Sequence, residues 1–193
     1  MASLPLLSCS TPHNPSEPAV KPDQIERFDL TGQDVANFLG ITAGKFSFAL
    51  SKSSAITCWV DAYDRGVMKP QEVIRVDVPS TSKKGDVIIF LGRLGNSSEE
   101  TIQVYLSVVT YSDGVFGSTT YRSTDHATVE NFFQGMSHGT AWEGVSVEYG
   151  KEIVLWKLAG SRGEFGISGS DTLEELVNKS DKTLILNIRF SEK

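Results

Sequence analysis

The chain has 193 residues, of which 39% are hydrophobic and 22% charged, and this composition excludes wholesale disorder and collagen-like repeats. Its longest apolar run is too short for a helix that spans a bilayer. Basic residues number 18 and acidic residues 24, and the formal net charge of -6 argues against a nucleic-acid binder that works by neutralising phosphates. Two cysteines, Cys9 and Cys58, are too few for a disulfide scaffold or a structural zinc site. These observations leave a mostly β domain.

An extended N-terminal arm is predicted for residues 1–23, ahead of a single domain at 24–193. The arm is interrupted by prolines that block both a helix and a central strand: Pro5, Pro12, Pro15, Pro18 and Pro22. Residues 1–7 lack a positively charged start, which argues against a signal peptide. Residues 1–44 contain fewer basic side chains (Lys21, Arg27) than acidic ones (Glu17, Asp23, Glu26, Asp29, Asp34). The arm is therefore acidic and has no basic tail for nucleic acid.

Nine segments alternate in polarity or form short apolar runs between turn residues, which is typical of β-strands. They are residues 45–50, 55–63, 73–78, 86–93, 101–111, 115–121, 144–149, 152–158 and 183–190. The segment 86–93 is apolar on both faces, which predicts a central strand. The connections at 112–114 and 149–151 suit hairpins.

Helical signals are short. Asp171 is the predicted N-cap of a helix, with Glu174 completing a capping-box-like pair ahead of Leu176 and Val177. Residues 33–39 and 128–134 are two further candidates. Many strands with few helices predict an all-β fold, an antiparallel two-sheet β-sandwich, with the eight-stranded viral jelly roll as the expected form and short helices in its connections. An immunoglobulin sandwich lacks its Cys–Trp–Cys spacing here, and a closed barrel stays open as an alternative.

Candidate catalytic residues are sparse. Ser123, Asp125 and His126 have the residue types of nucleophilic catalysis, but adjacency in one loop does not place a base on a nucleophile. No Gly-x-Ser-x-Gly elbow is present, so a loop with local hydrogen bonds is the preferred interpretation. The remaining histidines, His13 and His138, have no metal-ligand spacing.

Four other motifs have a structural explanation. Asp61 and Asp64 could hold calcium, but a solvated turn is favoured because no dense loop of oxygen ligands follows. The glycines of segment 160–166 have the spacing of a phosphate-binding loop, but the helix that should follow such a loop is missing. The dipeptide Gly44-Lys45 occurs in nucleotide-binding loops, but the glycine that should precede it in such a motif is absent. The sequons at 96–98 and 178–180 are expected chance matches. Three tryptophans are expected in the core or in subunit contacts: Trp59, Trp142 and Trp156.

The sequence also resembles a known family. Residues 152–165 read Glu-Ile-Val-Leu-Trp-Lys-Leu-Ala-Gly-Ser-Arg-Gly-Glu-Phe, an apolar strand that runs into a glycine-containing loop. Residues 183–190, Thr-Leu-Ile-Leu-Asn-Ile-Arg-Phe, form a last strand that closes on Arg-Phe, and residues 102–106 form a similar earlier strand. Together these segments resemble the small capsid proteins of picorna-like plant viruses of the comovirus group.

The resemblance implies a coat subunit that self-assembles with other capsid subunits into an icosahedral shell, without enzymatic activity. It implies a location in the virion, and in the host cytoplasm during assembly, with little direct binding of nucleic acid and no membrane partner. No catalytic, cofactor-binding or metal-binding residue is assigned, and no cofactor is expected. A ligand- or glycan-binding β-sandwich is the main alternative, and a hydrolase is a weaker one.

Overall fold

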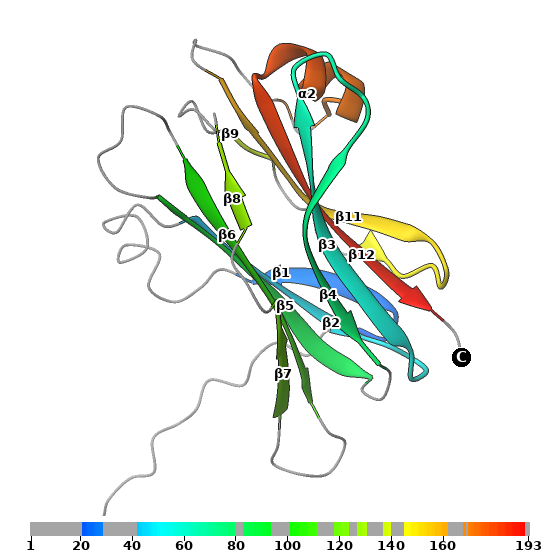
Figure 1. Ribbon diagram of the computed structural model, residues 1–193. Coiled ribbons are helices and arrows are strands. Elements are labelled where there is room, and N and C mark those ends of the chain that lie inside the picture. The colour runs from blue at the N-terminus through cyan, green and yellow to red at the C-terminus, as the bar shows by residue number, and fades with distance from the viewer. Residues whose placement is uncertain are drawn as a thin grey trace, which may run out of the picture.

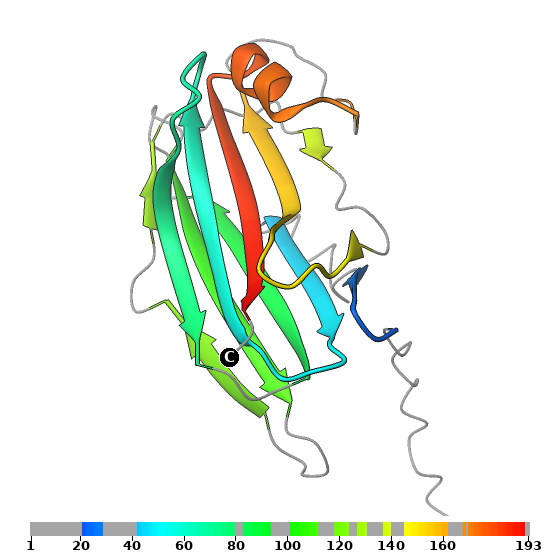
Figure 2. The same ribbon diagram turned by 90° about the vertical axis from the view of Figure 1, so that its right-hand side faces the viewer.

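The computed structural model describes residues 21–28, 42–79, 83–93, 101–111, 118–123, 127–130, 137–139, 145–161, 168 and 170–191. Two antiparallel β-sheets lie face to face (Figures 1 and 2). The predicted two-sheet sandwich is thus confirmed at the level of its layers. Residues 1–20 of the predicted arm lie outside the described residues.

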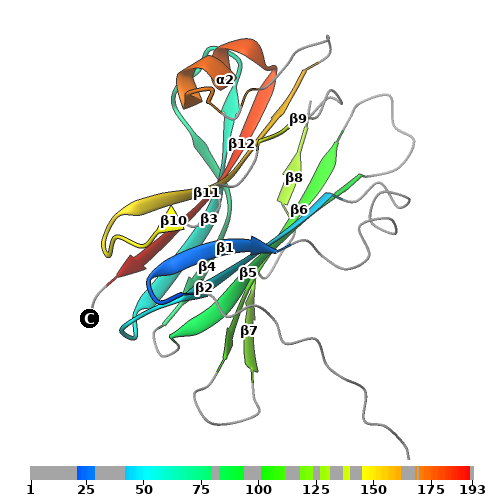
Figure 3. The ribbon, with the colours of Figure 1, turned by 180° about the vertical axis from the view of Figure 1, so that it is seen from behind.

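The first sheet contains β1 (Gln24–Phe28), β2 (Thr42–Ala49), β5 (Lys84–Arg93), β6 (Ile102–Tyr111), β7 (Ser118–Arg122), β8 (Ala127–Val129) and β10 (Val145–Ser146). Its strands follow the order β10-β1-β2-β5-β6-β7, and β8 pairs with the far end of β6. Figure 3 shows β1 and β10 together at one side of this sheet. The segment 86–93, predicted as a central strand, lies between β2 and β6 as expected.

The second sheet contains β3 (Ala55–Asp64), β4 (Gln71–Val78), β9 (Ser137–Gly139), β11 (Glu152–Gly160) and β12 (Lys182–Ser191). Its order is β4-β3-β12-β11-β9, so the last strand of the chain is central. Each residue of β12 from Lys182 to Ser191 is paired with β3. A strand so close to the C-terminus is therefore fixed on both sides.

The core lies between the sheets and comes from alternate residues of each strand. Phe46 of β2 packs against Trp156 of β11 at a ring-centroid distance of 6.3 Å, and Phe48 packs against Phe190 at 5.3 Å. All four side chains are buried. A β-bulge between Val154 and Trp156 interrupts the alternation of β11. Leu155 and Trp156 are both buried in the core as a result.

One helix is present among the described residues, α2 (Leu173–Lys179), which lies across one end of the second sheet (Figure 1). Val177 packs there on Tyr63 and Ile185. The predicted helix is confirmed, but its N-cap is Thr172 rather than Asp171, and the partner in its capping box is Glu175 rather than Glu174.

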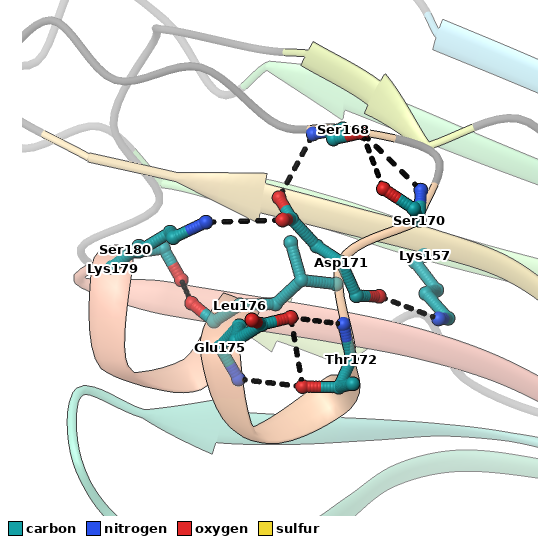
Figure 4. A network of polar contacts seen from close by, with 9 residues as sticks. All are labelled: Lys157, Ser168, Ser170, Asp171, Thr172, Glu175, Leu176, Lys179 and Ser180. Carbon is teal, nitrogen blue, oxygen red and sulfur yellow. Dashed lines mark hydrogen bonds and ion pairs between the residues drawn. The ribbon is translucent and has the colours of Figure 1, made fainter.

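The shift of one residue follows from the hydrogen bonds of Asp171 (Figure 4). Its carboxylate accepts from the backbone N–H of Ser168 at 2.8 Å and pairs with Lys179 Nζ at 3.0 Å. Thr172 is left to accept from the N–H of Glu175 at 3.2 Å, while Glu175 Oε2 accepts from the N–H of Thr172 at 2.7 Å.

Nine predicted strands appear, and the differences lie elsewhere. The three-residue strand β9 was not predicted. Residues 127–129, partly within a predicted helix, form β8 instead, because Thr128 and Val129 pair with β6. The turn at 149–151 does not close a hairpin, since β10 belongs to the first sheet and β11 to the second. β1 was not predicted, because the sequence Gln-Ile-Glu-Arg-Phe has no clear alternation. The helix predicted at 33–39 lies outside the described residues.

Candidate functional site

The outer face of the first sheet carries an apolar surface that the chain leaves exposed. Alternation turns Val87 and Ile89 of β5 toward the core and Ile88 and Phe90 outward. Phe90 lies directly opposite Tyr105 of β6 in the register of the two strands. Phe90 is 40% exposed and Tyr105 43%. Single exposed apolar side chains are ordinary, whereas neighbouring ones that form a contiguous patch mark an interaction surface.

These residues line a groove of about 500 Å³, which we call the outer groove. It is lined by Ile88, Phe90, Gly92, Tyr105, Leu106, Ser107, Val109, Thr120, Arg122 and Ser123. Ser107 is in register with Arg122, and Val109 with Thr120, so β7 supplies the polar side of the groove. Arg122 is the only charged residue in this lining, and no ion pair joins it to a carboxylate of the described residues.

A compact polar cluster lies next to the groove on the same face. Asp86 is buried and accepts a hydrogen bond from Ser47 Oγ at 2.5 Å. Tyr111 donates its hydroxyl proton to the other oxygen of Asp86, which also pairs with Lys45 Nζ at 3.3 Å. The carboxylate is therefore fully occupied by neighbouring side chains, which is the arrangement of a structural ion pair.

A second polar cluster lies on the outer face of the second sheet. Asp61 Oδ2 accepts hydrogen bonds from Trp59 Nε1 and Asn187 Nδ2, each at 2.9 Å. Burial raises the pKa of the Asp61 carboxyl above its ordinary value, and the charge of Glu72 acts in the same direction. Arg189 lies over the Trp59 ring at 5.4 Å and helps to cover it.

Asp61 and Asp64 do not form a cation site. They face opposite sides of β3, because three positions separate them in a strand whose side chains alternate. Asp64 forms an ion pair with Lys182 on the neighbouring strand. The prediction of a solvated turn is also wrong for Asp61, which is buried within the strand.

The Ser–Asp–His group predicted as a loop is only partly described. Ser123 follows β7 and lines the outer groove, whereas Asp125 and His126 lie outside the described residues. His13 does too, and His138 belongs to β9. Among the described residues, no group of three His, Cys, Asp or Glu side chains is arranged to hold a metal ion.

The tryptophans, the glycine motifs and the cysteine that the structure describes belong to strands or to the core. Trp156 is in the core as expected, Trp59 is buried on the outer face of the second sheet, and Trp142 lies outside the described residues. Gly160 ends β11, and the pair at 44–45 is part of β2 rather than a nucleotide loop. Cys58 is buried in the core, and burial raises the pKa of its thiol, which disfavours a nucleophilic role.

The outer groove was missed by sequence reasoning although its signal is visible. Segment 86–93 is apolar on both faces, and a strand of that kind normally has another layer on each side. The segment 101–111 also places aromatic residues on its outward positions. Two neighbouring strands with apolar outer faces indicate an exposed surface once their pairing is known.

Among the residues that the structure describes, no helix is long and apolar enough to cross a membrane. Comparison with known proteins returned no matching family model, no similar curated protein and no similar solved structure.

Proposed function

We propose that this protein is a structural subunit that assembles with other coat subunits into an icosahedral virus shell. The observation that carries the proposal is the exposure of apolar side chains at two separate places on the sandwich. One place is the outer groove on the first sheet, and the other is the turn between β3 and β4. A subunit of a closed shell contacts several neighbours, so it needs more than one such surface.

The turn between β3 and β4 presents Val67 and Met68, each 48% exposed. The turn is held against the end of α2, because the N–H of Gly66 donates to the carbonyl of Val177 at 3.0 Å. The N–H of Arg65 donates to the carbonyl of Asp181 at 3.1 Å. Because the backbone of this turn is already fixed, little backbone entropy is lost when a neighbour covers its apolar side chains.

Jelly-roll connectivity is the finer part of the proposal. Two facing antiparallel sheets support it. The pairing of the consecutive strands β11 and β12 within one sheet is a departure, since the chain of a jelly roll passes between the sheets at this step. An experimental map of the assembled particle that traces the strand order would decide this point.

The proposal is tested with the purified full chain. Negative-stain electron microscopy and analytical ultracentrifugation over a range of salt, pH and protein concentration should show closed particles of uniform diameter. A chain that stays monomeric under every condition would contradict the proposal.

A second candidate function, a glycan- or ligand-binding module, is favoured by one observation. Phe90 and Tyr105 form an aromatic pair beside hydroxyl groups and Arg122, which is the composition of a small ligand site. Binding to a panel of immobilised glycans that is lost in Tyr105→Ala, by a chain that forms no particles, would support this candidate instead.

A further inference from the structure

The N-terminal arm contains a segment whose spacing suits the outer groove. Pro12, Pro15 and Pro18 recur every three residues. A polyproline II helix has three residues per turn, so these prolines would lie along one face of it. Proline faces of this kind bind grooves lined by aromatic side chains. We call residues 12–18 the proline segment.

We propose that the proline segment occupies the outer groove of its own chain in the unassembled protein. The proposal does not depend on the shell function proposed above. It concerns the free chain, in which this segment would cover an aromatic surface that is otherwise exposed.

The lengths of the two partners agree. Tyr105 and Tyr111 both face outward on β6, and six residues of strand correspond to about 20 Å. Pro12 and Pro18 are also six residues apart, which is about 19 Å in a polyproline II helix. The segment is therefore long enough to extend along β6 from the outer groove at Tyr105 to Tyr111, which lies beyond the groove lining.

The arm also begins at the right place. Gln24, Ala49, Lys84 and Tyr111 are paired in one row across β1, β2, β5 and β6. Three strand spacings separate Gln24 from Tyr111, which is about 14 Å. A turn folds residues 21–24 back, because the N–H of Gln24 donates to the carbonyl of Lys21 at 3.3 Å, and such a turn brings Lys21 within about 7 Å of Gln24. The three residues from Pro18 to Lys21 add about 9 Å when they are extended. Pro18 can therefore reach Tyr111 within one chain.

The point where the arm joins the sandwich is fixed. The N–H of Asp23 donates to the carbonyl of Ala49 at 2.7 Å. Its carboxylate accepts from the N–H of Ser51 at 2.8 Å and from the Tyr149 hydroxyl at 2.7 Å. With its end anchored on the same sheet as the groove, the proline segment has a raised effective concentration there.

The anchoring also sets the direction. Pro18 should lie near Tyr111 and Ser118, and Pro12 near Phe90 and Tyr105.

The test places a photocrosslinking p-benzoylphenylalanine in the full chain, at position 90 in one protein and at position 118 in another. Samples are irradiated under dilute conditions in which the chain is monomeric by ultracentrifugation. A mixture of 15N-labelled and unlabelled protein distinguishes adducts within one chain from adducts between chains. Position 90 should label residues around Pro12, and position 118 should label residues around Pro18, both within one chain.

Two variants provide the comparison. Replacing Pro12, Pro15 and Pro18 by alanine should lower the adduct yield several-fold. Replacing His13 and Ser16, which lie on another face of a polyproline II helix, should leave the yield unchanged.

Three results would overturn the proposal: no adducts with residues 10–20, the reverse pattern of labelling, or adducts only between chains. The last result would show that the groove takes a segment from a second copy.

Discussion

Asn187 donates a hydrogen bond from Nδ2 to Oδ2 of Asp61 over 2.9 Å, although 126 positions separate the two residues in the chain. Both side chains are buried on the outer face of the second sheet, and Asn187 is only 1% exposed. Asn187 Oδ1 has no hydrogen-bond partner within the described part of the chain. The cluster therefore buries a carboxylate that accepts hydrogen bonds only from neutral donors, and beside it one amide oxygen without a partner, and both features are costly in a buried position.

This cluster predicts a specific dependence of stability on pH. The raised pKa of Asp61 means that the folded protein takes up a proton at higher pH than the unfolded chain does. The contribution of Asp61 to the free energy of unfolding should therefore increase as the pH falls through its raised pKa toward about 4. Asp61→Asn keeps an acceptor for Trp59 and removes the charge, so we expect it to be at least as stable as the parent at pH 7 and to lack this increase.

Urea unfolding between pH 4 and 8 measures the effect, and Asp77→Asn is the control of opposite sign. The pKa of Asp77 is lowered, mainly by the hydrogen bond that its carboxylate accepts from Arg75. The charged form of Asp77 therefore stabilises the fold, and Asp77→Asn should lose stability at neutral pH. A marked loss of stability in Asp61→Asn at pH 7 would show that the charged form is the stabilising one.

A side chain added at Gly85 is expected to disturb the packing of the core. A Cβ atom at this position would lie 2.6 Å from Cζ of Phe48 and would also collide with the carbonyl oxygen of Val109. Gly85→Ala should reduce the free energy of unfolding by about 1–3 kcal/mol, the usual cost of overpacking. Gly92→Ala is the matched control on the same strand, because no atom lies within 4 Å of its new Cβ. Equal stability of the two variants in urea titrations would contradict the packing around Gly85.

The N-cap residue Thr172 is expected to contribute to the stability of α2. Thr172→Ala removes the acceptor for the N–H of Glu175, and an N-cap loss of this kind costs about 1 kcal/mol. Thr172→Ser retains a hydroxyl and should recover most of the loss. Hydrogen exchange of the α2 amides, together with thermal unfolding, measures both effects. Unchanged exchange in Thr172→Ala would place the stability of α2 in its packing on Tyr63 and Ile185 alone.

Substitutions in the turn between β3 and β4 are expected to impair assembly without impairing folding. Replacing Val67 and Met68 by serine removes two exposed apolar side chains and should weaken particle formation, while the unfolding midpoint stays within error of the parent. Lys69→Ser, an exposed change in the same turn, is the control. Particle yields are compared by ultracentrifugation, and normal assembly of the serine variant would exclude this turn as a subunit contact.

Local patterns in the sequence determined most strands. The alternation of Ile102, Val104, Leu106 and Val108 marks β6 with one buried face, and the helix at 173–179 follows from its capping residues and apolar side. These features depend on side-chain period and short-range hydrogen bonds, which are encoded within a few residues. The exact cap at Thr172 required the structure, because Asp171 is withdrawn from capping by Ser168 and Lys179.

Only the tertiary structure decided where the surfaces lie. Strand order cannot be read from a local pattern, because β12 pairs with β3 across more than a hundred residues. The same pairing brings Asn187 to Asp61, and the pairing of β5 with β6 sets Phe90 opposite Tyr105. The sequence by itself determined which residues are apolar and which segments extend. Burial depends on what packs against each face, so the exposed groove and the buried carboxylate became visible only when distant strands were joined.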